Sequence, residues 1–213
     1  MENRMREVAS GANKKIKIGV IPGHFATNHS HVNNYVDMTG IKTHHKMAKE
    51  TARELAKEYL TSTSVDTIIC LEGTEIIGAF LAEELSRDGH ASINNGKDIA
   101  VITPETNANN QLIFRDNLQK DIYGKQIVLL ISSASTGKTI MRSVECLQYY
   151  NGILAGISSI FSAIGDYNGV KVNSVFTPTD IPNYESVAFE DCSMCKSGQK
   201  IDAIINSYGY SKI

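Results

Sequence analysis

Short apolar runs alternate with helical segments along most of this chain, and this alternation limits the fold more than any other feature of the sequence. The apolar runs occupy residues 65–71, 98–102, 126–131, 153–164 and 172–176, and helical patterns occupy residues 43–60, 75–86 and 139–150. Strands that alternate with helices predict a parallel α/β sheet with right-handed crossovers. Because the runs are apolar throughout rather than at every second position, we expect helices on both faces of the sheet.

The carboxyl ends of the predicted strands are the places to look for a site, because open α/β sheets bind ligands there. The stretch IVLLISSASTGKT at residues 127–139 gives the strongest signal. Gly137 permits a positive φ angle, and the N–H groups of the turn and of the following helix converge with partial positive charge. Hydroxyl groups and a lysine add further donors, so the stretch predicts a phosphate-binding turn made of Ser132, Ser133, Ser135, Thr136, Gly137, Lys138 and Thr139. The alternative is an ordinary turn whose hydroxyl groups cap the helix.

A second turn, made of Glu72, Gly73, Thr74 and Glu75, follows the strand predicted at residues 65–71. Its backbone N–H groups at a helix start could bind an anion, and its acids could orient magnesium or a lysine. The alternative is a helix N-terminus in which Thr74 is the cap and the acids are favoured by the helix dipole.

Histidines and cysteines are not expected to form a metal site. His24, His29 and His31 are close in sequence, but no Cys or carboxylate lies among them. Cys192 and Cys195 form one C-x-x-C pair, which is half of a zinc site, and we expect plain thiols there. A redox pair, or zinc shared between subunits, is the alternative for this pair.

Charge and composition exclude several classes of protein. Lys and Arg total 21 and Asp and Glu total 23, so no basic field points to nucleic acid or a membrane surface. The apolar runs are far shorter than the roughly 18 residues of a membrane span. Residues 1–15 are polar, lack the apolar core of a secretory signal, and are expected to be a disordered lead-in. With only 4 cysteines, the chain is expected to be reduced and cytoplasmic.

Several of these stretches together resemble the type I phosphoribosyltransferases, and the orotate phosphoribosyltransferases are the most similar branch. Residues 127–140 resemble the phosphoribosyl pyrophosphate loop of that family, and residues 72–79 resemble its pyrophosphate loop. Residues 23–37 resemble the N-terminal hood segment, and residues 192–202 resemble the tail of some members. The resemblance implies a parallel-sheet, Rossmann-like core with a small hood, as a single domain over residues 16–213. The hood would come from residues 16–40, with the C-terminal tail as a further candidate.

The resemblance also implies a chemistry, in which a nucleobase nitrogen displaces magnesium pyrophosphate from C1 of phosphoribosyl pyrophosphate. Residues 135–139 would bind the 5′-phosphate, and residues 72–74 would approach the pyrophosphate. Magnesium is the implied cofactor. The family forms homodimers in which a loop, here residues 104–116, covers the neighbouring site, and Arg115 is the candidate basic residue of that loop.

One departure from the family keeps the function open and leaves the catalytic residues unassigned. Two adjacent acids hold the ribose hydroxyls in the family, and Ile131 and Ser132 occupy those positions here. The leading hypothesis is a phosphoribosyltransferase of nucleotide metabolism, related to pyrimidine biosynthesis. The alternative is a regulator with the same fold that binds a nucleotide or sugar phosphate without turnover. A distant alternative is a P-loop-like hydrolase, because Gly137-Lys138-Thr139 matches the end of the P-loop pattern, with Ser132 at its first glycine position.

Overall fold

Strand β8 (Gln126–Ala134) lies in the middle of a six-stranded sheet in the computed structural model of the chain, which describes residues 1–89, 91–107 and 111–213. The strand order is β10-β11-β9-β8-β4-β5. The five strands from β11 to β5 are parallel, and the edge strand β10 runs antiparallel to β11. The other strands of this sheet are β4 (Thr67–Cys70), β5 (Ala100–Ile102), β9 (Ile153–Ser162), β10 (Asp166–Tyr167) and β11 (Val170–Phe176).

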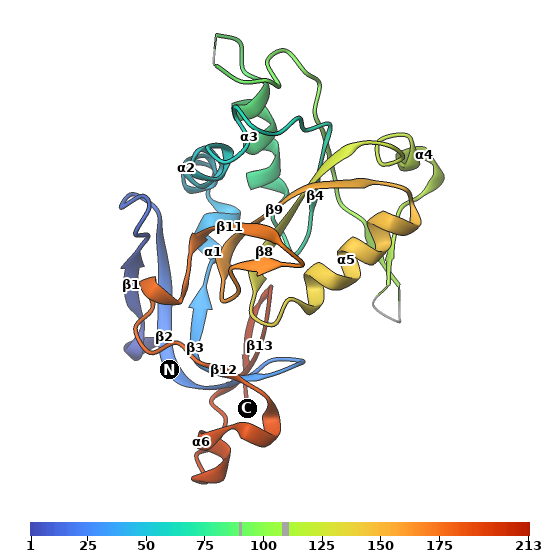
Figure 1. Cartoon of the computed structure of the whole chain (residues 1–213). Helices are drawn as coiled ribbons and strands as arrows, with labels where there is room; N and C mark the ends of the chain where they lie inside the picture. The colour runs from blue at the N-terminus through green and yellow to red at the C-terminus, as the bar shows by residue number, and fades with distance from the viewer. Residues whose placement is uncertain (90, 108–110) are drawn as a thin grey trace.

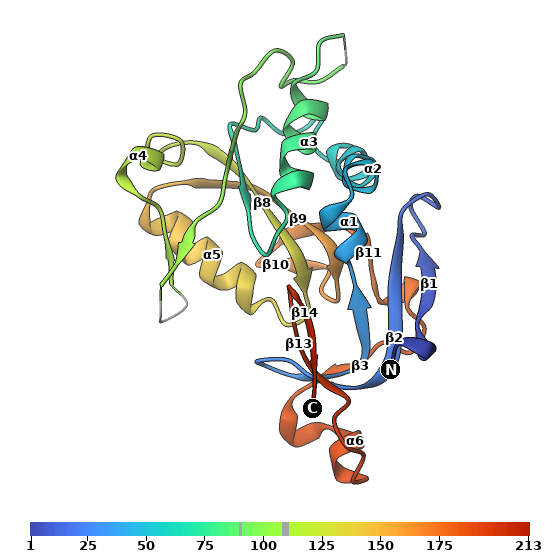
Figure 2. The same cartoon turned by 180° about the vertical axis from the view of Figure 1, so that it is seen from behind.

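Helices cover both faces of this sheet, as the apolar runs predict (Figures 1 and 2). Val128 and Leu130 of β8 belong to the core cluster that also contains residues of α2 and α3. Ile127, Leu129 and Ile131 belong to the opposite cluster, which contains residues of α5. The helices are α1 (Thr39–Thr43), α2 (His45–Ala56), α3 (Glu75–Ser86), α4 (Asp116–Gln119), α5 (Lys138–Tyr149) and α6 (Ser193–Lys196).

The predicted α/β class is confirmed, and the main differences lie at the ends of elements. The helix predicted at residues 75–86 has those bounds. The one predicted at 43–60 is shorter at both ends, because residue 43 belongs to α1 and turns follow Ala56. β8 continues beyond residue 131, because Ser133 pairs with Phe161 and Ala134 pairs with Ser162 of β9. The polar residues at the end of the run are therefore strand residues rather than turn residues.

A second sheet, which we call the hood, lies beside the carboxyl ends of the main sheet (Figures 1 and 2). Its strands have the order β12-β3-β2-β13-β14, and β1 also pairs with β2. The C-terminal segment enters the hood through β13, which runs parallel to β2 with Ala203 opposite Phe25. The hood strands are β1 (Arg6–Ala9), β2 (Lys17–Ala26), β3 (His31–Asp37), β12 (Ser186–Val187), β13 (Ala203–Asn206) and β14 (Gly209–Lys212).

Residues 1–15 differ from the expected disordered lead-in, because they carry hood strand β1 and contact the main sheet. The Ser10 hydroxyl donates to the carbonyl of Val175 at 2.7 Å, and the Gly11 N–H donates to the Asp180 carboxylate at 2.7 Å. The remaining elements are the hairpin β6 (Glu105–Thr106) and β7 (Leu112–Ile113), and the 3-10 helices η1 (Glu2–Arg4), η2 (Pro178–Asp180) and η3 (Phe189–Asp191). Among the described residues, no helix has the length and apolar character to cross a membrane.

Gly156 in β9 gives a test of the core, because the buried ring of Tyr59 packs directly over it. A Cβ atom at Gly156 would lie 2.5 Å from Cε1 of Tyr59, whose hydroxyl is held by Ser158 at 2.7 Å. We expect Gly156→Ala to lower the free energy of unfolding by about 1–3 kcal/mol, measured by urea denaturation. The control is Gly165→Ala, where a Cβ atom meets nothing within 4 Å. Equal stability of the two variants would contradict this packing.

Candidate functional site

A pocket of about 250 Å³ lies between the carboxyl end of β8 and the hood. The main sheet contributes Glu72 and the turn that leads into α5. The hood contributes residues of the β2–β3 hairpin, and the β13–β14 hairpin contributes Ile205, Asn206 and Ser207. The end of β8, the turn and the start of α5 contribute Ser133, Ala134, Ser135, Thr136, Gly137, Lys138, Thr139, Ile140 and Arg142. The pocket is therefore at the end of the sheet where the sequence predicts a ligand.

The turn between β8 and α5 has the backbone geometry expected of an anion site. Gly137 is the N-cap residue of α5, with φ 76° and ψ 0°. This left-handed conformation turns the chain sharply and aims the first N–H groups of the helix at the pocket. No side chain of the described residues caps this helix start, so its N–H groups remain for a ligand.

The carboxylate of Glu72 lies on the end of β8, where it accepts hydrogen bonds at one oxygen. Oε2 accepts from the Ser132 hydroxyl at 2.6 Å, from the Ser132 N–H at 3.2 Å and from the Ser133 N–H at 3.4 Å. Glu72 thus supplies a negative charge beside Ser132, which stands at one of the two positions where the resemblance expects an acid. The Ile131 side chain is fully buried in the cluster beneath α5 and contributes no polar atom.

The backbone of the Glu72 turn is strained and is held from the hood side. Glu72 has φ 60° and Gly73 has φ 81°, and a left-handed conformation is uncommon for a residue with a side chain. The half-buried Lys42 ammonium donates to the Glu72 carbonyl at 3.2 Å and also donates to the Ser207 carbonyl. Burial lowers the pKa of Lys42, while the nearby Glu72, Asp37 and Glu75 oppose that shift. Lys42 therefore ties the turn to the β13–β14 hairpin.

Three of the described residues that line the pocket are basic. Lys138 and Arg142 are one turn apart on α5, and His29 comes from the β2–β3 hairpin. Burial lowers the pKa of His29, and the charges of Lys138 and Arg142 lower it further. This positive field favours an anion. The sequence pattern indicated Lys138 but missed Arg142, which the i,i+4 spacing on α5 could have revealed.

Several predicted site residues do not line the pocket. Ser132 is buried and its hydroxyl donates to Glu72, so it orients the Glu72 carboxylate without lining the pocket itself. Thr74 does not cap α3 with its side chain, because its hydroxyl donates to the carbonyls of Leu71 and Leu130. Gly73 and Glu75 are also absent from the described lining residues.

The predicted loop at residues 104–116 is only partly described, because residues 108–110 lie outside the described part of the chain. Its candidate basic residue, Arg115, forms an ion pair with Glu105 and is not among the described residues that line the pocket. That pairing raises the pKa of Arg115 and lowers the pKa of Glu105.

The three histidines of the β2–β3 hairpin separate into two groups. His29 lines the pocket, whereas His24 and His31 are buried together, with His24 Nε2 3.0 Å from His31 Nδ1. Cys192 and Cys195 lie beside this second pair. From the sequence we expected no relation between the histidines and these cysteines. The structure places His24 and His31 next to both cysteines.

The chain superposes on solved structures of phosphoribosyltransferases. The chain superposes on the Leishmania donovani UMP synthase with a TM-score of 0.57 at 17% identity, over 84% of this chain and 36% of that chain. The fold is that of the type I phosphoribosyltransferases. The chain spans only about a third of the UMP synthase, and no family model or curated protein sequence matches it.

Two further phosphoribosyltransferase structures cover most of their own length. The Mycobacterium tuberculosis orotate phosphoribosyltransferase, in complex with phosphoribosyl pyrophosphate, gives a TM-score of 0.51 at 14% identity, over 69% of this chain and 82% of that chain. The adenine phosphoribosyltransferase of Thermoanaerobacter pseudethanolicus gives 0.50 at 17% identity, over 83% and 96%. The phosphoribosyltransferase fold agrees with the turn geometry. The P-loop alternative fits the strand less well. Ser132 stands at the first glycine position of that pattern, which belongs to a loop, but β8 continues to Ala134 and Ser132 is a strand residue.

Gly137→Val tests the anion site directly. Valine is strained at φ 76°, and its Cβ atom would lie 3.1 Å from Cδ1 of Ile164. We expect sulfate binding, measured by titration calorimetry, to weaken by about tenfold or more, because the turn must change shape. The control is Gly169→Val, which carries similar strain at φ 81° with nothing within 4 Å of its Cβ atom. If both variants bind sulfate as the natural chain does, the turn is not the anion site.

The positive field predicts a pH dependence that His29 controls. A bound anion offsets the charges of Lys138 and Arg142, so it should raise the lowered pKa of His29 and drive proton uptake. Sulfate affinity should therefore increase as the pH falls from about 8 to about 5, and it should level off below the pKa that His29 has in the absence of the anion. Calorimetry with the natural chain and with His29→Gln tests this. An unchanged pH dependence in His29→Gln would refute the assignment.

Proposed function

We propose that the chain binds the phosphoribosyl group of phosphoribosyl pyrophosphate in this pocket and transfers it to a nucleobase. The observation that carries the proposal is the Glu72 carboxylate, held on the end of β8 beside an uncapped helix start. In this arrangement the N–H groups of residues 137–139 bind the 5′-phosphate, assisted by Lys138 and the hydroxyls of Ser135 and Thr136. The fold and the positive field at Lys138, Arg142 and His29 support this placement.

Glu72 would hold the ribose in place of the missing acid pair. One of its carboxylate oxygens is already oriented by Ser132 and Ser133, so the carboxyl group is fixed before the sugar binds. A hydroxyl that donates to a carboxylate contributes roughly 1.5–3 kcal/mol, more than a bond to a neutral partner. Fixing the sugar also favours the reaction, because C1 must be aligned between the leaving group and the base.

Magnesium fits this site through one carboxylate and the substrate. Mg²⁺ in phosphate-binding sites takes one or two carboxylates together with phosphate oxygens and water. Glu72 is the acid among the described lining residues, so it would contribute to holding the ion, and the substrate would supply most of the ligands. When bound, the ion supplies neutralisation of the pyrophosphate charge.

In this reaction the protein positions the reactants and stabilises charge, and it supplies no nucleophile. The bond from C1 to the pyrophosphate oxygen breaks, a bond from C1 to a base nitrogen forms, and that nitrogen loses its proton. The transition state gains positive charge on the ribose, and the Glu72 carboxylate would stabilise that charge. Hood residues that line the pocket, such as Tyr35, Asn206 and Ser207, would surround the base. The homodimer that the resemblance implies stays a prediction.

A regulator that binds the same ligand without turnover is the second candidate. The burial of Ile131 favours this candidate. An isoleucine lacks the carboxylate that the family has at this position, but it packs well in the strand and the core. With a single carboxylate, the protein would bind the sugar phosphate but stabilise the transition state less. Turnover distinguishes this candidate from the enzyme.

Glu72→Gln tests the ribose contact. The amide oxygen can still accept from Ser132, so the turn should persist while the charge is lost. We expect binding of phosphoribosyl pyrophosphate with magnesium to weaken by about ten- to a hundredfold by titration calorimetry. Inorganic phosphate, which lacks the ribose, should bind both proteins equally.

The control is Glu75→Gln, because Glu75 is an exposed acid three residues away that does not line the pocket. It should bind phosphoribosyl pyrophosphate as the natural chain does. Pyrophosphate release in the presence of a panel of nucleobases then tests transfer. Binding without release for any base would favour the regulator. No binding of phosphoribosyl pyrophosphate would refute both candidates.

A further inference from the structure

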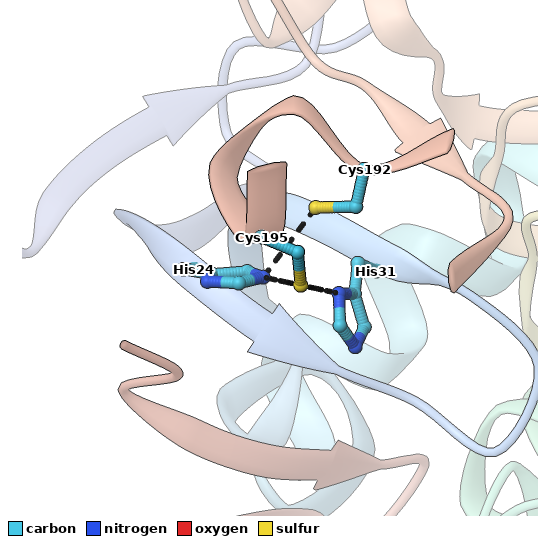
Figure 3. A group of neighbouring side chains, drawn as sticks. All are labelled: His24, His31, Cys192 and Cys195. Atoms are coloured by element: carbon cyan, nitrogen blue, oxygen red, sulfur yellow. Dashed lines mark hydrogen bonds between the residues drawn. The ribbon is translucent and has the colours of Figure 1, made fainter. Parts of the chain in front are cut away.

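Four side chains that can ligate a metal meet in the hood, and none of them is among the described residues that line the pocket. His24 belongs to β2, His31 begins β3, and Cys192 and Cys195 flank the start of α6, more than 160 residues later in the chain (Figure 3). Their ligand atoms all lie within 4.8 Å of one another. His24 and Cys192 are fully buried, and His31 is nearly so. Such a group of nitrogen and sulfur atoms is not explained by the phosphate pocket.

The spacing of these atoms is close to that of a tetrahedral metal site. With Zn–N bonds of about 2.0–2.1 Å and Zn–S bonds of about 2.3 Å, tetrahedral ligands lie about 3.3 Å (N to N) and about 3.6 Å (N to S) apart. His24 Nε2 is 3.0 Å from His31 Nδ1. The sulfurs of Cys192 and Cys195 are 3.5 and 3.6 Å from His24 Nε2, and Cys195 Sγ is 3.2 Å from His31 Nδ1.

The surroundings of His24 hold its ring in the form that binds a metal. Its Nδ1 is 2.9 Å from the Gln199 carbonyl oxygen, which only accepts hydrogen bonds. Nδ1 therefore carries the proton, and the lone pair of Nε2 points at the other three ligand atoms. The backbone of His24 is also fixed, because its N–H donates to Asp202 at 2.9 Å and its carbonyl accepts from the Asp202 N–H at 2.7 Å.

We propose that His24, His31, Cys192 and Cys195 bind one Zn²⁺ ion. Two imidazoles and two thiolates are a donor set that favours zinc, and C-x-x-C is a common spacing for two of its ligands. Four protein ligands close the coordination sphere, so the ion is structural rather than catalytic. This proposal replaces our expectation from sequence of plain thiols and no metal. It does not depend on the proposed function.

The ion would join two parts of the hood that lie far apart in the sequence. On one side is the β2–β3 hairpin, whose turn carries Asn28 and His29 to the pocket. On the other side is the segment with Cys192 and Cys195, which continues into β13 and the pocket residues Asn206 and Ser207. The two parts are also joined by a short parallel pairing of β13 with β2, in which Ala203 pairs with Phe25 and Ile204 with Ala26, and by the hydrogen bonds of His24 with Gln199 and Asp202. The zinc site therefore stabilises the wall of the pocket.

Metal content of the full chain tests the proposal. We expect purified, reduced protein to contain one zinc ion per chain, measured by inductively coupled plasma mass spectrometry, and to retain it through dialysis without chelator. Replacement by Co²⁺ should give the intense visible bands of tetrahedral cobalt together with thiolate charge transfer. Removal of zinc by a chelator should lower the melting temperature, and added Zn²⁺ should restore it.

Variants locate the site. Cys195→Ser changes an exposed residue, so the chain should fold while its zinc affinity falls by at least about a hundredfold. Cys146→Ser and His29→Gln are matched controls, since neither side chain is in the cluster, and both should keep one zinc. Circular dichroism checks folding of each variant. Two results would overturn the proposal: folded natural chain that binds no added Zn²⁺ by calorimetry, or Cys195→Ser that keeps zinc as firmly as Cys146→Ser.

Discussion

The central position of β8 is the constraint on which the other parts of this molecule depend. Its two parallel neighbours, β4 and β9, satisfy its backbone, and its apolar side chains alternate between two core clusters. Every side chain from Ile127 to Ile131 is buried, so a slip by one residue would exchange the side chains of the two core clusters. The turn that follows is therefore fixed in the middle of the sheet edge, and the pocket forms where that turn meets the hood.

The link between Glu72 and the end of β8 shows how a carboxylate from one turn can be held beside a strand end that carries no acid of its own. The strand residue Ser132 carries no charge itself, but its hydroxyl and N–H orient a carboxylate from the neighbouring turn. The uncommon backbone conformation of Glu72 brings that carboxylate into reach. A left-handed glutamate costs on the order of 1 kcal/mol or more, which favours a functional reason for its presence.

Local patterns in the sequence predicted the main sheet, its helices and the position of the turn between β8 and α5. α3 has the predicted bounds because a buried strand and a turn define its start, and periodicity defines its face. Contacts between distant segments were not predictable in this way. The pairing of β13 with β2, the position of the Glu72 carboxylate on Ser132, and the meeting of His24 with Cys192 all depend on three-dimensional folding. No periodicity within a single segment encodes them. Residues 6–9 were missed for the same reason, since β1 is a strand only because β2 pairs with it.

The assembly of the hood from early and late segments has a consequence for synthesis. Chains emerge from the ribosome with the N-terminal part first, and the strands of the main sheet are complete once residue 176 has been made. At that stage Phe25 and Ala26 of β2 still lack their β13 partners, Ala203 and Ile204. An unpaired strand edge is a template for pairing with other chains. The nascent protein therefore passes through an interval in which its core is formed, its pocket is open and its hood edge is vulnerable to aggregation.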